Sequence, residues 1–229
     1  MEYCYHTTKL QYLRSILQSG LQPDYGRNSS LVGDKRKGKI YYSAGIQATV
    51  KMFSSFDASY YRVHDENINE EEFKRNLSSE DYIKHQKYIK DILNSKSFED
   101  FIKDNVYLCF SGERLSDKNE DKPMDSYTSE SISPDQLSVC VIRKRSDGSI
   151  YAFSMKDIYS YFNAKDSSLE TGLEVLDFED TINKYQSDEY YMDYISLQRF
   201  CDMYPELTIE SGKVKTVILS EEQNDDYDR

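Results

Sequence analysis

The chain has 229 residues, of which 38% are hydrophobic and 14% aromatic, and 41 acidic residues against 29 lysines and arginines give a formal net charge of −12. A surface this acidic repels phosphate backbones and anionic lipids, so neither long nucleic acids nor membranes are expected as main partners. The length suits a single domain over 1–229, in which we expect a helical insertion at 65–104 and an acidic tail at 221–229.

The cysteines and the N-terminus predict a cytoplasmic protein with reduced thiols. No C-x-x-C pair and no metal-ligand spacing is present, so no metal site is expected. The opening "MEYCYHTT" lacks the basic and apolar regions of a signal peptide, and no apolar run approaches the roughly 18 residues of a membrane span. Cysteine in an apolar run acts as a small hydrophobic residue, the role expected for three of Cys4, Cys109, Cys140 and Cys201.

The first segment predicts a strand followed by an amphipathic helix. "EYCYHT" at 2–7 has the composition of a short strand. Thr8 with Gln11 fits a capping box, which predicts a helix that starts at Lys9, and Gly20 stands where a helix C-terminus favours a left-handed residue. The apolar residues in this segment recur at helical spacing: Leu10, Leu13, Ile16 and Leu17.

The remaining elements predict an α+β fold with a mostly antiparallel sheet, because the strands outnumber the possible βαβ units. The charged run 65–104 carries a narrow apolar stripe, so we expect helices laid against the core, with His64 and His85 in solvent. Asp147–Gly148 marks a hairpin turn. In chain order we expect a polar loop at 22–38, a strand at 39–44, a helix at 45–53, a strand at 105–112, a polar loop at 113–136, a hairpin over 137–155, a short helix at 156–163, and strands at 188–197 and 212–220.

Three of these segments together resemble the ADP-ribosyltransferase superfamily. They are the opening "YHTT…L..IL..GL", the strand "GKIYYS", and the late strand that opens with Glu189. In this order they resemble the branch marked by histidine, tyrosine and glutamate, which includes the poly(ADP-ribose) polymerases and the diphtheria-toxin-like enzymes. The resemblance implies a mostly antiparallel split sheet with flanking helices.

The resemblance also implies an NAD-dependent mono-ADP-ribosyltransferase that modifies a protein, for example as a bacterial toxin or a phage or immunity factor. In that activity NAD is a substrate, and its nicotinamide–ribose bond breaks through an oxocarbenium-like state, as in glycoside cleavage. The protein has to hold NAD, orient its ribose and stabilise the positive charge that develops on the sugar. A neutral histidine, a stacking aromatic ring and one carboxylate supply these functions.

The roles of individual residues follow from the resemblance. His6 would hydrogen-bond ribose hydroxyls of NAD, and the backbone of Thr7 would bind the carboxamide, with the Thr8 hydroxyl beside it. The family usually has glycine at the position of Thr7, so the space beside nicotinamide would shrink. Tyr41 matches the motif tyrosine under nicotinamide, and Ser43 belongs to the same cofactor-binding set.

Two of these assignments have competitors in the sequence. Phe53, or Met52, lies about where the family's second stacking aromatic falls. Glu189 is the expected catalytic carboxylate, because it opens an aromatic strand that is followed by "ISL" and a terminal strand, and Glu210 in "TIESGK" is the reserve. Three other acids compete for the same role: Asp188, Glu174 and Glu179.

Structural explanations compete with the catalytic ones. A histidine at a strand end can be structural, Thr8 can be a plain helix cap, and one of the alternating tyrosines Tyr41 and Tyr42 faces the core by default. Two other functions stay open: the same fold acting on nucleic acid, by ADP-ribosylation or RNA 2′-phosphate transfer, and a catalytically inactive binding module. The basic run "DKRKGK" at 34–39 could hold a small anionic ligand such as a nucleotide.

Overall fold

The computed structural model describes residues 3–23, 38–44, 60–61, 63–64, 71, 74–75, 77–122, 125–157 and 189–205. Its strands are β1 (Tyr3–Lys9), β2 (Ile40–Ala44), β3 (Asn105–Ser111), β4 (Asn119–Lys122), β5 (Asp125–Thr128), β6 (Ser138–Lys144), β7 (Ile150–Ala152) and β8 (Tyr190–Ser196). Its helices are α1 (Leu13–Ser19), α5 (Ser79–Leu93), α6 (Phe98–Ile102) and α10 (Leu197–Met203), with 3-10 turns η1 (Leu10–Tyr12), η5 (Gly112–Arg114) and η6 (Pro134–Gln136).

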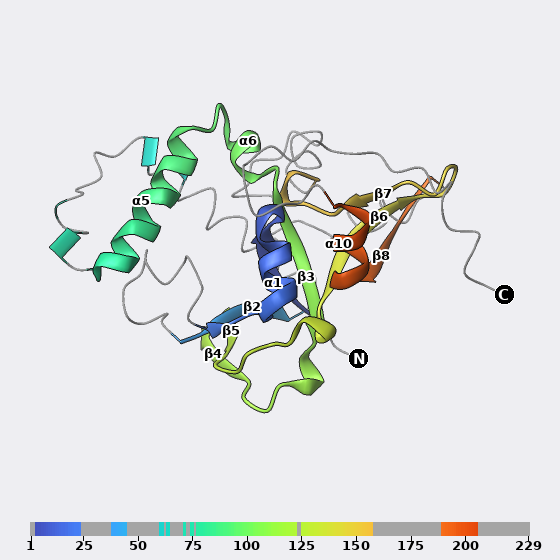
Figure 1. Cartoon of the computed structure of the whole chain (residues 1–229), viewed down its shortest axis with the longest axis horizontal. Coiled ribbons are helices and arrows are strands. Elements are labelled where there is room, and N and C mark those ends of the chain that lie inside the picture. Colours follow the sequence, from blue (N-terminus) through green and yellow to red (C-terminus); the bar gives the residue numbers. More distant parts are fainter. Residues whose placement is uncertain are drawn as a thin grey trace.

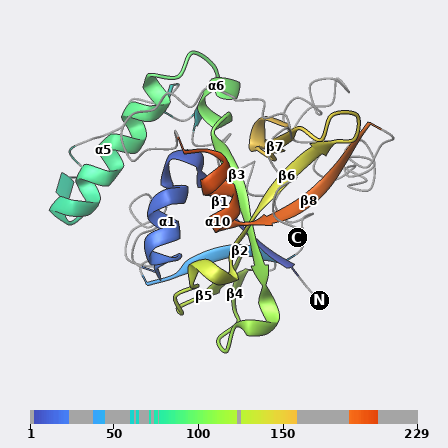
Figure 2. The same cartoon turned by 45° about the vertical axis from the view of Figure 1, so that its right-hand side comes forward.

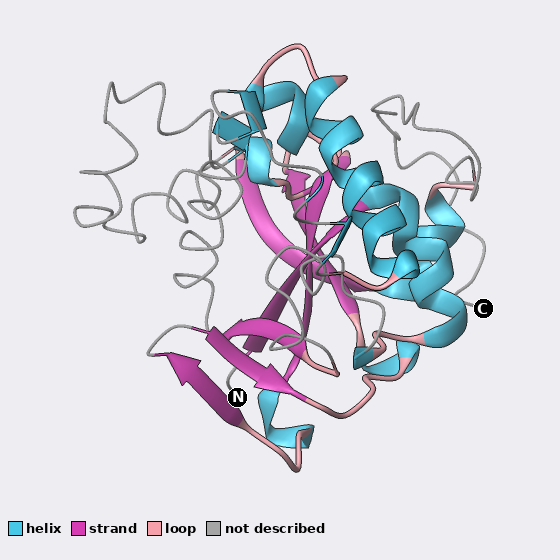
Figure 3. Ribbon diagram, turned by 90° about the vertical axis from the view of Figure 1, so that its left-hand side faces the viewer, coloured by secondary structure: helices cyan, strands magenta, loops and turns pink. Residues whose placement is uncertain are grey.

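The described strands form one sheet in the order β4-β5-β2-β1-β3-β6-β7, and β8 also pairs with β6. Every described pairing between these strands is antiparallel. Figure 3 shows the twist of the sheet, in which the strands of its lower part run at a steep angle to those of its upper part. The predicted α+β class with a mostly antiparallel sheet is confirmed.

Two hydrophobic clusters cover opposite faces of the sheet, because side chains alternate along each strand. In β1 and β3, Cys4 and Leu108 belong to the cluster that contains residues of α1 and α10, whereas Tyr5 and Tyr107 belong to the cluster that contains residues of α5 and α6. We call these two sides the α1 face and the α5 face. Figures 1 and 2 show α1 and α10 next to each other, with α5 set apart from them.

The first helix begins later than predicted. β1 continues through Thr8 and Lys9, both of which pair with β3, and η1 precedes α1. No side chain caps η1, so the predicted capping box of Thr8 and Gln11 is wrong. The reason is that β3 offers ladder hydrogen bonds to Thr8 and holds it in the strand. Gly20 ends α1 with a φ of 72°, which confirms the predicted left-handed residue.

The polar run 113–136 was predicted as a loop but contains the hairpin of β4 and β5. β5 pairs with β2 and places Tyr127 directly opposite Tyr41. β4 has the sequence NEDK and ends the strand order. Charged residues on an outer strand disfavour pairing of its free edge with another chain. They also remove the apolar alternation by which a strand is recognised in a sequence. The predicted strands that correspond to β2, β3 and β8, and the hairpin of β6 and β7, are confirmed.

Within the part of the chain that the structure describes, the run 65–104 contains α5 and α6, as predicted. Both helices contribute to the core of the α5 face. His85 is only 2% exposed, so the prediction that it lies in solvent is wrong. It shares one stripe of α5 with the buried Tyr88 and Ile92, three and seven positions further on. His64 is exposed, as predicted.

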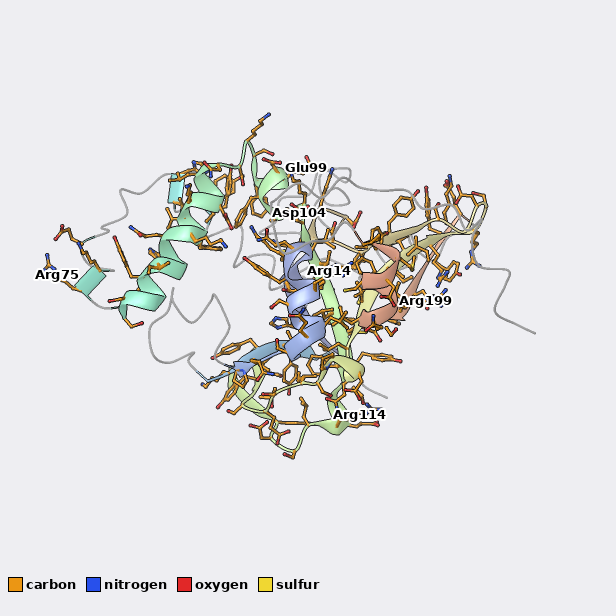
Figure 4. The ribbon with its side chains drawn as sticks, in the orientation of Figure 1. Arg14, Arg75, Glu99, Asp104, Arg114 and Arg199 are labelled. Atoms are coloured by element: carbon orange, nitrogen blue, oxygen red, sulfur yellow. The ribbon has the colours of Figure 1, made fainter. Side chains whose placement is uncertain are left out.

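Arg14 of α1 holds the C-terminal end of α10, where helix carbonyls lack intrahelical partners. Its Nη2 donates to the carbonyl oxygens of Cys201 at 3.0 Å and Tyr204 at 3.2 Å, and Figure 4 labels Arg14 on α1. We expect Arg14→Met to lower the free energy of unfolding by about 2 kcal/mol, because two carbonyls lose a charged donor. Urea unfolding measures this loss. The exposed Arg199 of α10, replaced by methionine, is the control, and an equal loss in both variants would contradict the role of Arg14.

Candidate functional site

His6 lies in β1 and connects this strand to β2 through its imidazole. Its Nδ1 lies 2.8 Å from the backbone carbonyl oxygen of Tyr41. A carbonyl oxygen can only accept, so Nδ1 carries the hydrogen, and in the neutral ring Nε2 keeps a lone pair that can accept a hydrogen bond. Burial lowers the pKa of His6, and the hydrogen bond to Tyr41 opposes that shift only in part. The imidazole is thus neutral at about pH 7.

The imidazole of His6 and the ring of Tyr41 lie on opposite faces of the sheet. Tyr5 of β1 is opposite Ser43 of β2, so Tyr41, two positions from Ser43, lies with Tyr5 on the α5 face. His6 is the next residue after Tyr5 and lies on the α1 face, as does Tyr42. The structure brings His6 to the backbone of Tyr41, and the two side chains do not line one shared hollow.

Tyr41 belongs to a small cluster of an amine and two rings, which we call the Tyr41 cluster and define as Lys39, Tyr41 and Tyr127. The ring centroids of Tyr41 and Tyr127 are 5.8 Å apart, and the ring planes meet at 44°. The Nζ atom of Lys39 lies 3.9 Å from the centroid of the Tyr127 ring. All three residues are half-buried. A cation over an aromatic face is attracted by the electron-rich ring, so this contact orients the amine.

The other residues proposed around NAD divide between the two faces. Thr7 and Ser43 lie on the α5 face with Tyr41, whereas Thr8 lies on the α1 face with His6, because each follows the alternation of its strand. Ser43 is 2% exposed, and both threonines are half-buried. The predicted set is therefore split by the plane of the sheet.

Glu189 lies far from His6. One row across neighbouring strands contains His6, Leu108, Val139 and Ile195. Glu189 precedes Ile195 by six positions, which is about 20 Å along an extended strand, and three strand spacings add about 14 Å across the sheet. Its backbone oxygen accepts a hydrogen bond of 2.8 Å from the turn of the β6–β7 hairpin, on the right of Figure 1. The structure does not bring Glu189 together with His6.

The carboxylate of Glu189 instead forms a hydrogen bond with the hydroxyl of the next residue, Tyr190. Glu189 is exposed, and its hydrogen bond to the Tyr190 hydroxyl raises the pKa of that tyrosine. Three strands away from β1, the alternation of β8 places Asp193 on the same face as Glu189, where it pairs with Arg143 at 2.7 Å. This end of β8 is thus a local network of charged and tyrosine side chains.

The sequence pattern did not indicate Tyr127, one residue of the Tyr41 cluster. Several other predicted features fall outside the described residues. Tyr127 was hidden in the predicted loop 113–136, where the alternation of "DSYT" was the available signal. In the sequence, Lys39 is marked only as the last residue of the basic run 34–39. Outside the described residues lie Phe53, Met52, Asp188, Glu174, Glu179 and Glu210, the predicted helix at 45–53, most of the helix at 156–163, the strand at 212–220 and the tail at 221–229.

The four cysteines are buried and free, without a disulfide. Burial raises the pKa of the Cys140 thiol, and the neighbouring Cys109 adds to this shift. A protonated, buried thiol is a poor nucleophile and a poor metal ligand.

No group of three His, Cys, Asp or Glu that could hold a metal ion occurs among the residues described. Within the same part of the chain, no helix combines the length and the apolar character needed to cross a membrane.

Comparison of the chain with protein-family models, with curated proteins and with solved structures gave no match. What the described residues define is an α+β protein with an antiparallel sheet, a neutral histidine bound to the backbone of the neighbouring strand, and an aromatic–cation cluster on the opposite face. An activity has to be argued from these residues and from the motifs in the sequence.

The lowered pKa of His6 makes the stability of the fold depend on pH. Below the ordinary histidine value of 6.5 the unfolded chain binds a proton that folded His6 does not, so the free energy of unfolding falls with pH in that window. We expect the stability advantage of the wild type over His6→Gln to be smaller at about pH 5.5 than at about pH 7.5. Urea unfolding at both pH values measures it. A stability advantage of the wild type that grows on acidification would refute the argument.

Proposed function

We propose that the chain is an NAD-dependent ADP-ribosyltransferase that transfers a single ADP-ribose from NAD to a protein. The observation that carries the proposal is the 2.8 Å hydrogen bond between His6 Nδ1 and the Tyr41 carbonyl oxygen, because it joins the two motif strands through the motif histidine. The antiparallel sheet around it supports the same proposal. A protein acceptor suits a chain with a net charge of −12 better than a nucleic acid does.

His6 would act as a positioned acceptor for the ribose. Its Nδ1 is held by Tyr41, so Nε2 can accept a hydrogen bond from a ribose hydroxyl. Fixing the sugar removes freedom that would otherwise have to be lost on the way to the transition state. Neutrality matters because positive charge develops on the ribose, and a charged imidazole beside it would oppose that charge.

A carboxylate near the ribose would stabilise the developing charge. Glu189 cannot reach a ribose held by His6, since it lies about 20 Å along β8 from the row that contains His6. Glu210, the other glutamate that the sequence offers for this role, lies outside the described residues. We propose Glu210 as the acid, and glutamine substitutions at both positions distinguish the two.

Incubation with NAD tests the proposal. The purified protein is mixed with cell lysate and with NAD labelled in its adenosine part. We expect release of nicotinamide and transfer of label to a band that protease removes and nuclease does not, and we expect His6→Ala to lose both products. Neither product from the wild type would overturn the proposal, and label in a nuclease-sensitive band would replace the protein acceptor by a nucleic acid.

A catalytically inactive binding module is the second candidate. One observation favours it: the described residues place Glu189 far from His6 and the Tyr41 ring on the opposite face of the sheet. A module of this kind would bind a partner or a nucleotide without breaking the nicotinamide–ribose bond. Titration calorimetry with NAD, run beside the nicotinamide assay, separates the two candidates, because binding without release identifies the module.

A further inference from the structure

We propose that the outer edge of β8 pairs with the same edge of a second copy of the chain, so that two sheets join into one across a twofold axis. The two β8 strands run antiparallel in this dimer, with Met192 of one copy opposite Met192 of the other. The dimer rests on backbone pairing and is independent of the proposed function.

β8 is the last described strand on its side of the sheet. Lys144 donates its backbone N–H to Ser149 on the β7 side of β6, and Arg145, the next residue, donates to Glu189 on the β8 side. Successive residues of a strand direct their backbone groups to opposite sides, so β7 and β8 flank β6, as Figures 1 and 2 show. Among the described residues, no strand pairs with the second side of β8.

The backbone of Met192 and Tyr194 points outward from this edge. Glu189 and Leu197, which flank β8, direct their backbone groups toward β6 and the residues next to it. Alternation then directs the N–H and C=O groups of Met192 and Tyr194 away from β6. The Tyr194 N–H agrees with this direction, because it donates to the carboxylate of Asp193 at 2.7 Å. An outward row of N–H and C=O groups is a template for pairing with another strand.

The side chains of β8 suit such pairing. β8 has the sequence YYMDYIS with one charged residue, Asp193, whereas β4 at the other end of the sheet has NEDK. Asp193 pairs with Arg143 of its own copy at 2.7 Å. The Tyr194 hydroxyl lies 2.8 Å from that of Tyr5, and its ring stacks on Tyr3 with centroids 5.1 Å apart. The edge therefore presents ordered aromatic side chains and lacks the charges that protect β4.

The sequence of β8 is complementary to itself, which favours a second copy as the partner. With Met192 at the twofold axis, Tyr190 of each copy lies opposite Tyr194 of the other, and Tyr191 lies opposite Asp193. The tyrosine pairs form on the α5 face, and cross-strand aromatic pairs stabilise a sheet. An axis through Asp193 would instead set two carboxylates opposite each other. The register about Met192 thus forms about six backbone hydrogen bonds and opposes no like charges.

Analytical ultracentrifugation of the full chain, without NAD, tests the dimer. We expect the mass to rise from 26.9 kDa toward twice that value as the chain concentration increases from about 5 to about 200 μM. The buffer contains about 0.5 M NaCl, which screens the repulsion between two copies that each carry a net charge of −12.

Substitutions on β8 test which surface forms the dimer. Met192→Lys places two ammonium groups opposite each other at the axis and should weaken association by about tenfold or more. Tyr190→Lys, at the first residue of β8, should weaken it as well, and it decides the question if Met192→Lys does not fold. Gln198→Lys adds the same charge at an exposed position of α10 and should associate like the wild type. Thermal unfolding checks that each variant folds.

Hydrogen exchange at the Met192 amide reports on the edge directly. We expect its exchange to slow by about tenfold or more as the dimer forms, because this N–H points outward in the monomer. A monomer at every concentration, or a dimer that Met192→Lys and Tyr190→Lys leave intact, overturns the proposal. Slow exchange of the Met192 amide in the dilute monomer also overturns it, because another segment of the chain then covers the edge. A dimer with these properties that releases no nicotinamide overturns the proposed function alone.

Discussion

Gly20→Ala is expected to lower the free energy of unfolding by about 3–5 kcal/mol. Gly20 has a φ of 72°, in the left-handed region that L side chains rarely adopt, and a Cβ on this residue would collide with the carbonyl oxygen of Ile132. That oxygen cannot retreat freely. It accepts from the Leu21 nitrogen at 2.9 Å, and the Ile132 nitrogen donates back to the Leu21 oxygen at 3.0 Å. Alanine therefore has to break this bridge or distort the end of α1.

Gly38 provides the matched control for this prediction. Its φ of 71° is almost the same, but no atom of the described residues lies within 4 Å of the position of a Cβ. Gly38→Ala should therefore cost only the left-handed backbone term, about 1 kcal/mol. Urea or thermal unfolding measures both variants. Equal losses at the two glycines would show that the close approach of Ile132 has no energetic consequence.

His6→Ala is expected to reduce ADP-ribose transfer by about a hundredfold or more, whereas Glu189→Gln should leave it within about twofold of the wild type. The first substitution removes the proposed ribose acceptor and the link to Tyr41. The second changes a carboxylate next to the first residue of β8, three strands away from β1 in the sheet. Initial rates of nicotinamide release at saturating NAD measure both.

Controls for the transfer prediction come from the same chain. His64→Ala, at an exposed histidine, should keep the wild-type rate. Glu210→Gln should lose transfer while NAD still binds, if Glu210 supplies the acid. A large loss in Glu189→Gln, with a folded protein and intact NAD binding, would show that Glu189 does reach the ribose and that the register of β6 and β8 does not hold during the reaction.

How far the fold could be predicted depended on how local each signal was. The strand at 39–44, the turn at Gly148 and the helix end at Gly20 were confirmed, because each is encoded within a few neighbouring residues. The capping box of Thr8 failed because a distant strand, β3, competed for the same backbone. The β4–β5 hairpin was missed because outer strands in solvent carry charge and lose their apolar alternation.

The candidate site depended on contacts that no local pattern contains. The sequence located His6 and Tyr41 in adjacent motifs, and the structure does join them, but through the backbone oxygen of Tyr41. Which face each side chain takes follows from strand register, and a shift of one residue exchanges the faces. His85 shows the same dependence, since only the packing of α5 on the sheet made it a buried residue.

By its own pattern, the chain determined an α+β class, an antiparallel sheet and the order of most elements, because hydrophobic periodicity and turn residues act over short distances. Tertiary structure alone decided that Glu189 lies far from His6, that the Tyr41 ring faces away from the imidazole, and that Lys39 meets Tyr127. The physical reason is that these relations arise from pairing and packing between residues remote in sequence, which periodicity does not encode.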